Sequence, residues 1–221
     1  MKQFQKRGGV SFGAQARNET PPAKERNVGK VDFFIADTHF YDRYCIRFDG
    51  RPFAGVEDMN EALIKRWNAA VGSDDRVFLV GDFCYGNGAD IVSTAQRLRG
   101  HKILIRGNHD NDVNLKYCFE EIHDYLEVHL DNATVILSHY PLSSFKDMQR
   151  GGTVHIYGHV HNSFEAKISN DVYNRLRQLP QRTYRFEAYN VGCMQPYMDY
   201  TPRTLEELRQ RTLCFPLKFD R

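Results

Sequence analysis

Five short polar clusters lie along this chain, each after a run of apolar residues that is typical of a buried strand. In chain order, the clusters are Asp37-Thr38-His39, Gly81-Asp82, Gly107-Asn108-His109-Asp110, Ser138-His139 and Gly158-His159-Val160-His161. Every cluster contains carboxylate, amide or imidazole groups that can bind a metal ion. Because several strand ends can meet at one sheet edge, residues far apart in the sequence can share one site. The pattern therefore predicts a fold in which strands end around a metal centre.

Apolar runs alternate with helical patterns over the first half of the chain, which predicts an α/β fold. Leu63 and Trp67 recur at helical spacing, and Thr204 with Glu207 forms a capping box that opens a C-terminal helix. Strands are predicted over 31–35, 77–80, 103–105, 125–130, 133–137, 153–157 and 184–191, helices over 57–71 and 91–98, and a hairpin turn at 131–132. Two sheets packed face to face as a β-sandwich, with helices outside, accommodate this order.

The N-terminal residues differ in composition from the rest of the chain. Residues 1–30 contain seven Lys or Arg and two Asp or Glu, with almost no apolar periodicity. We expect a flexible basic extension over 1–30 and one domain over 31–221, since this length suffices for a single core. The extension could make weak contact with nucleic acid, but stable nucleic-acid binding is not expected.

The start of the chain has no apolar stretch behind its charges, and no apolar run reaches the length of a membrane span. The five cysteines show no paired spacing, which favours reduced thiols. We therefore expect a cytoplasmic protein with no membrane contact. Oligomeric state is not indicated.

Mixed carboxylate, amide and imidazole donors suit Mn²⁺, Fe²⁺, Ni²⁺ and Zn²⁺. Two such ions about 3.5–4 Å apart need a ligand that bridges them, and Asp82 is the candidate because Gly81 lets the backbone turn off the strand. Asp37 and His39, two apart on an extended segment, would face one ion. His159 and His161 are also two apart, so they would either face one ion together or face two adjacent ions.

This donor set indicates a chemistry as well as a site. A water held between two cations becomes hydroxide near neutral pH and attacks phosphorus in line. The leaving alkoxide then needs a proton, which His109 can supply. Asp110 is expected to orient His109 and keep it charged. The sequence thus predicts a metal-dependent phosphoester hydrolase.

The five clusters resemble those of the calcineurin-like metallophosphoesterase superfamily, whose pattern is D-x-H, G-D, G-N-H-[DE], H, G-H-x-H. The resemblance extends over roughly residues 31–204. It implies the family's four-layer fold, a two-sheet β-sandwich flanked by helices, and His109 paired with Asp110 as the proton donor. It also implies one metal ion on Asp37, His39, Asp82 and His161 and a second on Asp82, Asn108, His139 and His159.

Small bacterial and phage members of that superfamily are more similar still. Arg51-Pro52-Phe53, Ser138-His139-Tyr140-Pro141 and Asn190-Val191-Gly192 fit their motifs. Asp42 and Tyr44, however, stand where those members have His and Asn. Their substrate therefore need not be the substrate of this chain.

Two features near the clusters have alternative interpretations. The segment 162–184, with Arg185 after it, contains several arginines (Arg175 and Arg177 among them), which either hold an anionic substrate or lie on a solvated helix. Tyr41 and Tyr140 flank the clusters and either stack on a base or ring or simply pack.

The main functional hypothesis is an enzyme that hydrolyses a phosphodiester of a nucleotide, a cyclic nucleotide or a nucleic-acid end, by attack of a metal-bridging hydroxide. Its cofactors would be two divalent metal ions, with Mn²⁺ favoured and Fe²⁺, Ni²⁺ or Zn²⁺ as alternatives. A phosphomonoesterase or protein phosphatase is the second hypothesis. A third is a scaffold that keeps this fold without catalysis, although such a protein would be expected to lose ligands.

Overall fold

Two four-stranded sheets form the centre of the protein in a computed structural model that describes residues 30–130, 133–179 and 185–214. The first sheet, in spatial order, consists of β1 (Asp32–Ile35), β2 (Arg76–Leu79), β3 (His101–Ile105) and β4 (Glu121–His123). The second consists of β5 (Tyr125–Leu130), β6 (Ala133–Ser138), β7 (Thr153–Tyr157) and β8 (Phe186–Asn190). Every pair is parallel except β5–β6, which is antiparallel.

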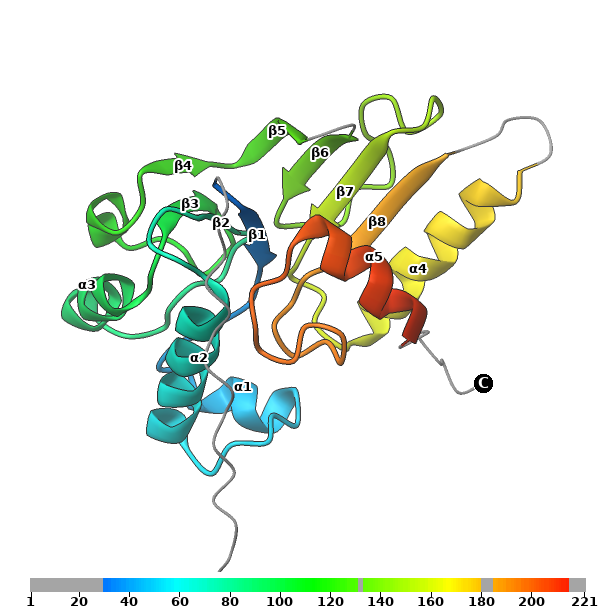
Figure 1. Ribbon diagram of the computed structural model, residues 1–221. Coiled ribbons are helices and arrows are strands. Elements are labelled where there is room, and N and C mark those ends of the chain that lie inside the picture. The colour runs from blue at the N-terminus through cyan, green and yellow to red at the C-terminus, as the bar shows by residue number, and fades with distance from the viewer. Residues whose placement is uncertain (1–29, 131–132, 180–184, 215–221) are drawn as a thin grey trace, which may run out of the picture.

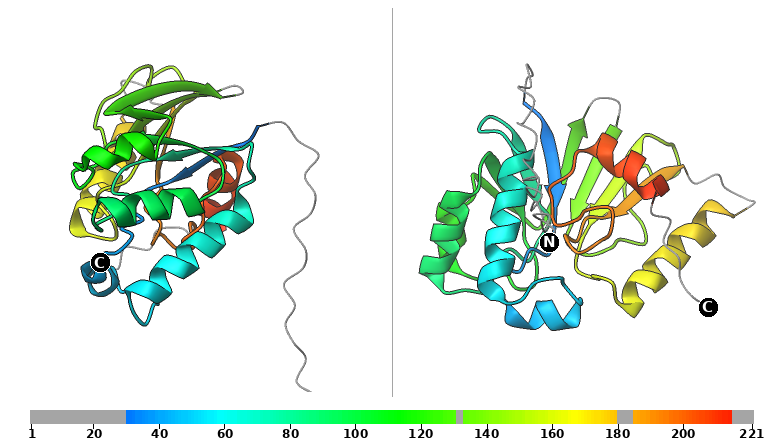
Figure 2. Two further views of the ribbon diagram at one scale, coloured as in Figure 1. Left: turned by 90° about the vertical axis from the view of Figure 1, so that its left-hand side faces the viewer. Right: turned by 60° about the horizontal axis from the view of Figure 1, so that its bottom comes forward.

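Helices cover both outer sides of the two sheets. They are α1 (Arg43–Phe48), α2 (Val56–Ala70), α3 (Gly88–Arg97), the 3-10 helix η1 (Val113–Tyr117), α4 (Phe164–Arg177) and α5 (Leu205–Cys214). Figure 1 and the right-hand view of Figure 2 show α2 and α3 on one outer side and α4 and α5 on the other, with the strands between them. The predicted fold, a two-sheet sandwich flanked by helices, is confirmed.

The apolar faces that were read from the sequence are buried as expected. Leu63 and Trp67 of α2 are almost fully buried, and Trp67 Nε1 donates to the Arg99 carbonyl at 3.0 Å, which ties α2 to the loop before β3. Burying such a side chain contributes about 1.5–3 kcal/mol. The capping box of α5 is also present, since Thr204 and Glu207 exchange backbone N–H and side-chain oxygen contacts.

The strand registers bring the polar clusters to one region. Ile35 pairs with Leu79, and Leu79 pairs with Leu104, so β1, β2 and β3 end side by side. In the second sheet, Leu137 of β6 pairs in parallel with Ile156 of β7. Parallel pairing therefore places three clusters at one edge of the first sheet and two at one edge of the second, and the packing of the two sheets brings these edges together.

Some elements were not expected from the sequence. The short helix α1 is one, and Asp42 caps its N-terminus by accepting the Tyr44 N–H at 2.7 Å. The strand β4 is another. The predicted hairpin turn at 131–132 and, except for Lys30, the predicted basic extension lie outside the described residues.

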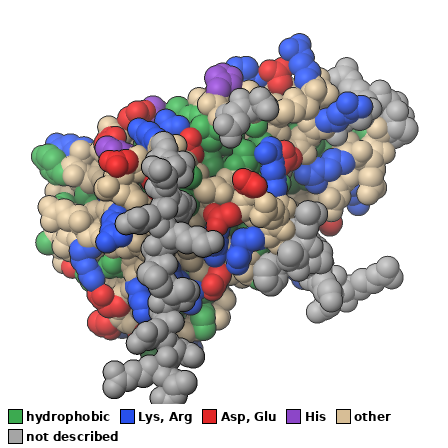
Figure 3. Space-filling view, viewed as in Figure 1, with side chains coloured by type: hydrophobic (Ala, Val, Ile, Leu, Met, Phe, Trp, Pro, Cys, Tyr) green, Lys and Arg blue, Asp and Glu red, His purple; other side chains and the backbone are tan. Residues whose placement is uncertain are grey.

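Two further features concern the charge on the surface and the character of the helices. Acidic and basic side chains are interspersed on the face shown in Figure 3. Among the described residues, no helix combines the length and the apolar character needed to cross a membrane.

Candidate metal centre

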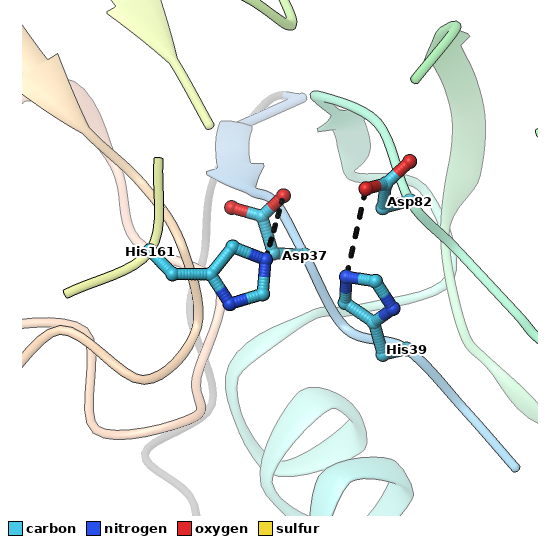
Figure 4. A group of neighbouring side chains, drawn as sticks. All are labelled: Asp37, His39, Asp82 and His161. Carbon is cyan, nitrogen blue, oxygen red and sulfur yellow. Dashed lines mark ion pairs between the residues drawn. The ribbon is translucent and has the colours of Figure 1, made fainter. Parts of the chain in front are cut away.

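Asp37, His39, Asp82 and His161 form the first group of possible ligands. One ligand atom from each lies within 4.8 Å of the others, and all four residues are buried. The Nε2 atom of His39 is 3.5 Å from Asp82 Oδ2, and Nε2 of His161 is 3.9 Å from Asp37 Oδ1. Figure 4 shows these side chains pointing toward one another from the loops that follow β1, β2 and β7.

A second group shares Asp82 with the first and adds His139 and His159. His139 Nε2 lies 3.5 Å from Asp82 Oδ2 and 3.2 Å from Asn108 Oδ1, so the amide of Asn108 lies beside this group. The structure thus brings together all seven residues that the sequence indicated as ligands. His159 and His161 fall into different groups, which agrees with the alternative of adjacent ions.

The backbone at five of these seven residues is left-handed. Asp37, His39, Asp82, His159 and His161 have φ angles of 53°, 48°, 57°, 67° and 44°. Such conformations cost on the order of 1–3 kcal/mol each and cluster at functional sites, where surrounding contacts impose them. The extended geometry expected for the first cluster is therefore wrong. Its carboxylate and imidazole reach one group because the chain turns at each ligand.

A buried imidazole nitrogen tests whether a cation fits here. Among the described residues, His39 Nε2 is the one buried side-chain polar atom without a hydrogen-bond partner. Leaving such an atom unsatisfied costs about 1–3 kcal/mol, so an orphaned lone pair beside the Asp82 carboxylate needs an explanation. A divalent cation supplies one, and the mixed oxygen and imidazole donors suit it. The residues present fit a divalent metal site.

Polar contacts at Nδ1, two of them hydrogen bonds and one an ion pair, orient three of the imidazoles so that Nε2 faces the groups. The Nδ1 partners are the Asp42 carboxylate for His39 at 3.5 Å, the Val80 carbonyl for His139 at 2.9 Å and the Asp49 carboxylate for His161 at 2.7 Å. Such partners select the tautomer whose other nitrogen can bind a metal. Asp42, a departure from the motif of the small bacterial members, therefore contacts a candidate ligand.

The charges at the shared carboxylate agree with a ligand role. Burial raises the pKa of Asp82, but the hydrogen bond and charge of His139 outweigh it and lower that pKa to about 2. For His139 both effects have the opposite sign. Burial lowers its pKa, but contact with Asp82 and the charge of Asp37 outweigh burial and raise the pKa to about 9. A proton and a cation therefore compete for His139 Nε2, so metal binding should release protons.

Asp110 makes contacts that differ from those expected. Its carboxylate accepts the backbone N–H groups of Asp82 at 2.7 Å, Phe83 at 2.9 Å and Gly107 at 2.8 Å. The expectation that it orients His109 is not met, because in the described part of the chain no hydrogen bond joins these two side chains. Asp110 instead ties the loop after β2 to the loop after β3, and these loops carry Asp82 and Asn108.

His109 itself is exposed at the edge of the centre. Its backbone N–H donates to Asp82 Oδ1 at 2.9 Å, and its ring lies 5.4 Å from the ring of His39. Its predicted role as proton donor stays a prediction.

The arginines that follow the last cluster lie elsewhere. Arg175 and Arg177 belong to the last turn of α4, and the guanidinium of Arg177 lies 4.6 Å from the centre of the Phe186 ring. Among the described contacts, none joins Arg175, Arg177 or Arg185 to the metal groups, and Arg182 lies outside the described residues. Packing against the second sheet explains Arg177 better than substrate contact.

Asp49 and Arg51 are the residues that the motifs did not indicate as part of the site. Both side chains are almost completely buried and form an ion pair at 2.8 Å next to His161. Arg51 was noted only as part of a family motif. The sequence signal for this pair was an Asp and an Arg close together in a stretch with no regular pattern, followed by a proline.

A two-sheet sandwich of mostly parallel strands, with Asp, Asn and His donors at the strand ends, is typical of a metal-dependent phosphoesterase fold. The chain belongs to the calcineurin-like phosphoesterase superfamily, whose model matches residues 33–204. This membership indicates a hydrolase of phosphoesters.

Individual proteins are also similar to this chain. An uncharacterised protein of Methanocaldococcus jannaschii is 31% identical over 140 residues, which cover 62% of this chain and 74% of that protein. A solved protein of unknown function from Aquifex aeolicus is 26% identical with a TM-score of 0.62, covering 82% of this chain and 99% of its own. The E. coli phosphoesterase Yfce is 15% identical with a TM-score of 0.36, covering 59% and 69% of the two chains. The Aquifex protein is the one that supports the fold.

Proposed function

We propose that this protein hydrolyses a phosphodiester at a centre of two divalent metal ions, with Mn²⁺ as the favoured cation. The observation that carries the proposal is that two donor groups share the Asp82 carboxylate. Its lowered pKa, about 2, keeps this carboxylate ionised near neutral pH, as a bridging ligand requires. When bound, the cations would supply an acidified water as nucleophile and neutralise charge on the phosphoryl oxygens.

In this proposal the residues that hold the cations follow the two donor groups. Asp37, His39 and His161 would hold one ion and Asn108, His139 and His159 the other, with Asp82 between them.

His109 is the proton donor of this proposal. Its ring is exposed to a substrate, whereas Asp37, His39 and Asp82 are buried. The bond from its N–H to the Asp82 carboxylate fixes the backbone of His109 next to the shared ligand. A leaving alkoxide bound at this edge would be within reach of the imidazole.

Three exposed rings support a substrate that contains a flat ring. We call Phe48, Tyr85 and Tyr140 the aromatic rim, and their side chains are 72%, 56% and 46% exposed. Each ring lies edge-on against a histidine of the centre: Phe48 against His161 at 5.8 Å, Tyr85 against His109 at 5.8 Å, and Tyr140 against His159 at 4.5 Å. Exposed aromatic rings beside a phosphate site favour nucleobases, which stack on them. The substrates we infer are therefore nucleotides, cyclic nucleotides or nucleic-acid ends.

The test compares two chromogenic esters on metal-stripped protein with Mn²⁺ added back. Bis-p-nitrophenyl phosphate should be cleaved faster than p-nitrophenyl phosphate, and Asp82→Asn should abolish both rates. Asp32→Asn is the matched control, because Asp32 pairs with Arg76 at the opposite end of β1 and β2. Its rates should equal those of the wild type.

Either of two results would overturn the proposal. Preference for the monoester would indicate a phosphomonoesterase or protein phosphatase. No cleavage of either ester, with metal demonstrably bound, would indicate a non-catalytic scaffold.

A further inference from the structure

A buried ion pair lies directly behind the first donor group. The side chains of Asp49 and Arg51 are 1% and 0% exposed, and both residues belong to the short stretch between α1 and α2. Charged side chains are rarely buried this completely unless paired, because removing them from water is costly. The partners of this pair therefore indicate what it does.

Arg51 binds the backbone of the first cluster. Its Nη2 donates to the carbonyl of Asp37 and its Nη1 to the carbonyl of Thr38, both at 2.9 Å. Its Nε donates to Asp49 Oδ2 at 2.9 Å. The guanidinium thus hydrogen-bonds two successive backbone carbonyls, and the first of them belongs to Asp37, which has a left-handed backbone. The guanidinium holds its donors in a rigid planar fork, a fixed geometry that the compact ammonium of a lysine does not reproduce.

Asp49 binds the imidazole at the other side of the same donor group. Its Oδ1 accepts the Nδ1–H of His161 at 2.7 Å, while its Oδ2 is held by Arg51. The result is a continuous chain of contacts from the backbone of Asp37, through Arg51 and Asp49, to the side chain of His161. These two ligands are 124 positions apart in the sequence but belong to one metal group.

The second donor group has a different partner for its buried histidine. The Nδ1 partner of His139 is the backbone carbonyl of Val80, the residue that follows β2 of the first sheet. In the described part of the chain, no hydrogen bond or ion pair joins Asp49 or Arg51 to Asn108, His139 or His159. The imidazoles of His161 and His139 are therefore oriented by different parts of the fold, although the two groups share Asp82 and the His159 N–H donates to the Asp37 carboxylate at 3.0 Å.

We propose that Asp49 and Arg51 form a positioning pair that sets metal affinity at one of the two ion positions only, the one held by Asp37, His39 and His161. Asp49 does so by requiring the tautomer of His161 in which Nδ1 carries the hydrogen and Nε2 is free to bind. This inference rests on the proposed two-ion centre and extends it to how the two positions differ.

Replacing Asp49 by asparagine should act through this tautomer. A carboxylate offers an acceptor to Arg51 and another to His161, whereas an amide offers one acceptor and one donor. Two donors of Arg51 face Asp49 Oδ2, so the amide oxygen should turn toward the guanidinium. The amide NH₂ would then face His161 and select the tautomer with its hydrogen on Nε2, which cannot bind a metal.

The experiment is a Mn²⁺ titration of metal-stripped wild type and Asp49→Asn by calorimetry, with electron paramagnetic resonance on the loaded samples. Wild type should bind two ions and show an exchange-coupled spectrum. In Asp49→Asn, one dissociation constant should rise about 10–100-fold, the range found for lost outer-shell partners, while the other stays unchanged. The spectrum should then become that of an isolated ion at limiting Mn²⁺.

Asp32→Asn is again the matched control, since it removes a charge from an Asp–Arg pair that does not touch the centre. It should bind both ions as the wild type does. Retention of the second ion in Asp49→Asn also shows that this variant is folded.

The outcomes separate this inference from the proposed function. A wild type that binds a single Mn²⁺ overturns the two-ion centre and this inference with it. Two ions in wild type and unchanged or equally weakened affinities in Asp49→Asn overturn only the positioning pair. A measurement on wild type alone gives an independent check: in the Zn²⁺-loaded protein, nitrogen NMR should find the His161 hydrogen on Nδ1, and a hydrogen on Nε2 would refute the proposal.

Discussion

At the scale of single residues, His109 differs in exposure from the other histidines of the centre. Its side chain is exposed, whereas the ligand carboxylates beside it are buried. A ligand gains from burial because a low dielectric strengthens its contact with a cation. A proton donor must instead reach the substrate, and only an exposed group can do so. Exposure therefore distinguishes His109 from the metal-binding histidines, which the residue type alone does not.

His109→Ala should retain metal binding but lose turnover in a way that depends on the leaving group. General acid catalysis contributes typically 10²–10⁴-fold, and it matters most when the leaving group is a strongly basic alkoxide. We expect a loss of about this size on an alkyl diester and a small one on bis-p-nitrophenyl phosphate. Steady-state kinetics on the two esters, with metal content measured in parallel, checks this.

The control for that comparison is His123→Ala, because the His123 side chain pairs with Glu121 on β4 and no described contact joins it to the metal groups. It should match the wild type on both esters. Equal losses on the two esters in His109→Ala would contradict the proton-donor role.

At the scale of elements, β7 carries a buried histidine that supports the loop next to the centre. All five residues of β7 are buried, and His155 donates from Nδ1 to the Ile136 carbonyl of β6 at 3.2 Å. Its Nε2 accepts the N–H of Leu142 at 3.1 Å, three residues after His139. This contact requires a neutral imidazole, since a protonated ring has no acceptor.

Protonation of His155 should therefore destabilise the fold in acid. Burial lowers its pKa from the ordinary 6.5 to about 4, so between these values the unfolded chain binds the proton and the folded chain does not. The contribution of neutral His155 to the free energy of unfolding is fully present above pH 6.5 and is lost as the pH falls toward 4. The loss between pH 7 and pH 5 is about 2 kcal/mol.

Urea unfolding of wild type and His155→Phe at pH 7 and pH 5 measures this effect. The variant will be less stable at pH 7 because it loses two hydrogen bonds, but its stability should fall less on acidification. An equal fall in both proteins would show that His155 is not responsible.

At the scale of the whole molecule, the aromatic rim comes from three separate segments. Phe48 ends α1, Tyr85 follows β2 and Tyr140 follows β6. The segments belong to different parts of the sequence and meet only because the two sheets pack together. The aromatic rim around the metal centre therefore forms only in the complete fold.

The rim should favour ligands that carry a base. AMP should inhibit ester hydrolysis more strongly than ribose 5-phosphate, since stacking on an aromatic ring contributes about 1–3 kcal/mol per base, or roughly 5–150-fold. Tyr140→Ala should remove much of that difference. Tyr117→Ala is the matched control, because Tyr117 is 71% exposed but lies on η1. Equal inhibition constants for the two compounds in wild type would contradict a base-binding rim.

Features that depend on neighbouring residues were mostly predicted correctly, whereas several that depend on contacts between distant segments were not. Strands and the helix α2 were predictable because apolar periodicity is local and burial only strengthens it. The contact between Asp110 and three backbone N–H groups was not, because two of those groups belong to a loop about 28 residues earlier. The left-handed backbone at Asp37 and His39 also opposes local preference and exists because contacts such as that of Arg51 impose it.

The sequence by itself determined which donor side chains are available and which strand each one follows, since donor type and apolar runs are properties of neighbouring residues. The motifs and their resemblance already indicated that Asp82 is shared and that His159 and His161 belong to different groups, which agrees with the two donor groups of the structure. Only the tertiary structure decided that Asp49 orients His161 and that Asp110 joins two loops. The physical reason is that a metal site depends on distances of a few ångströms between segments far apart along the chain. Those distances are set by sheet register and loop packing, which no single segment encodes.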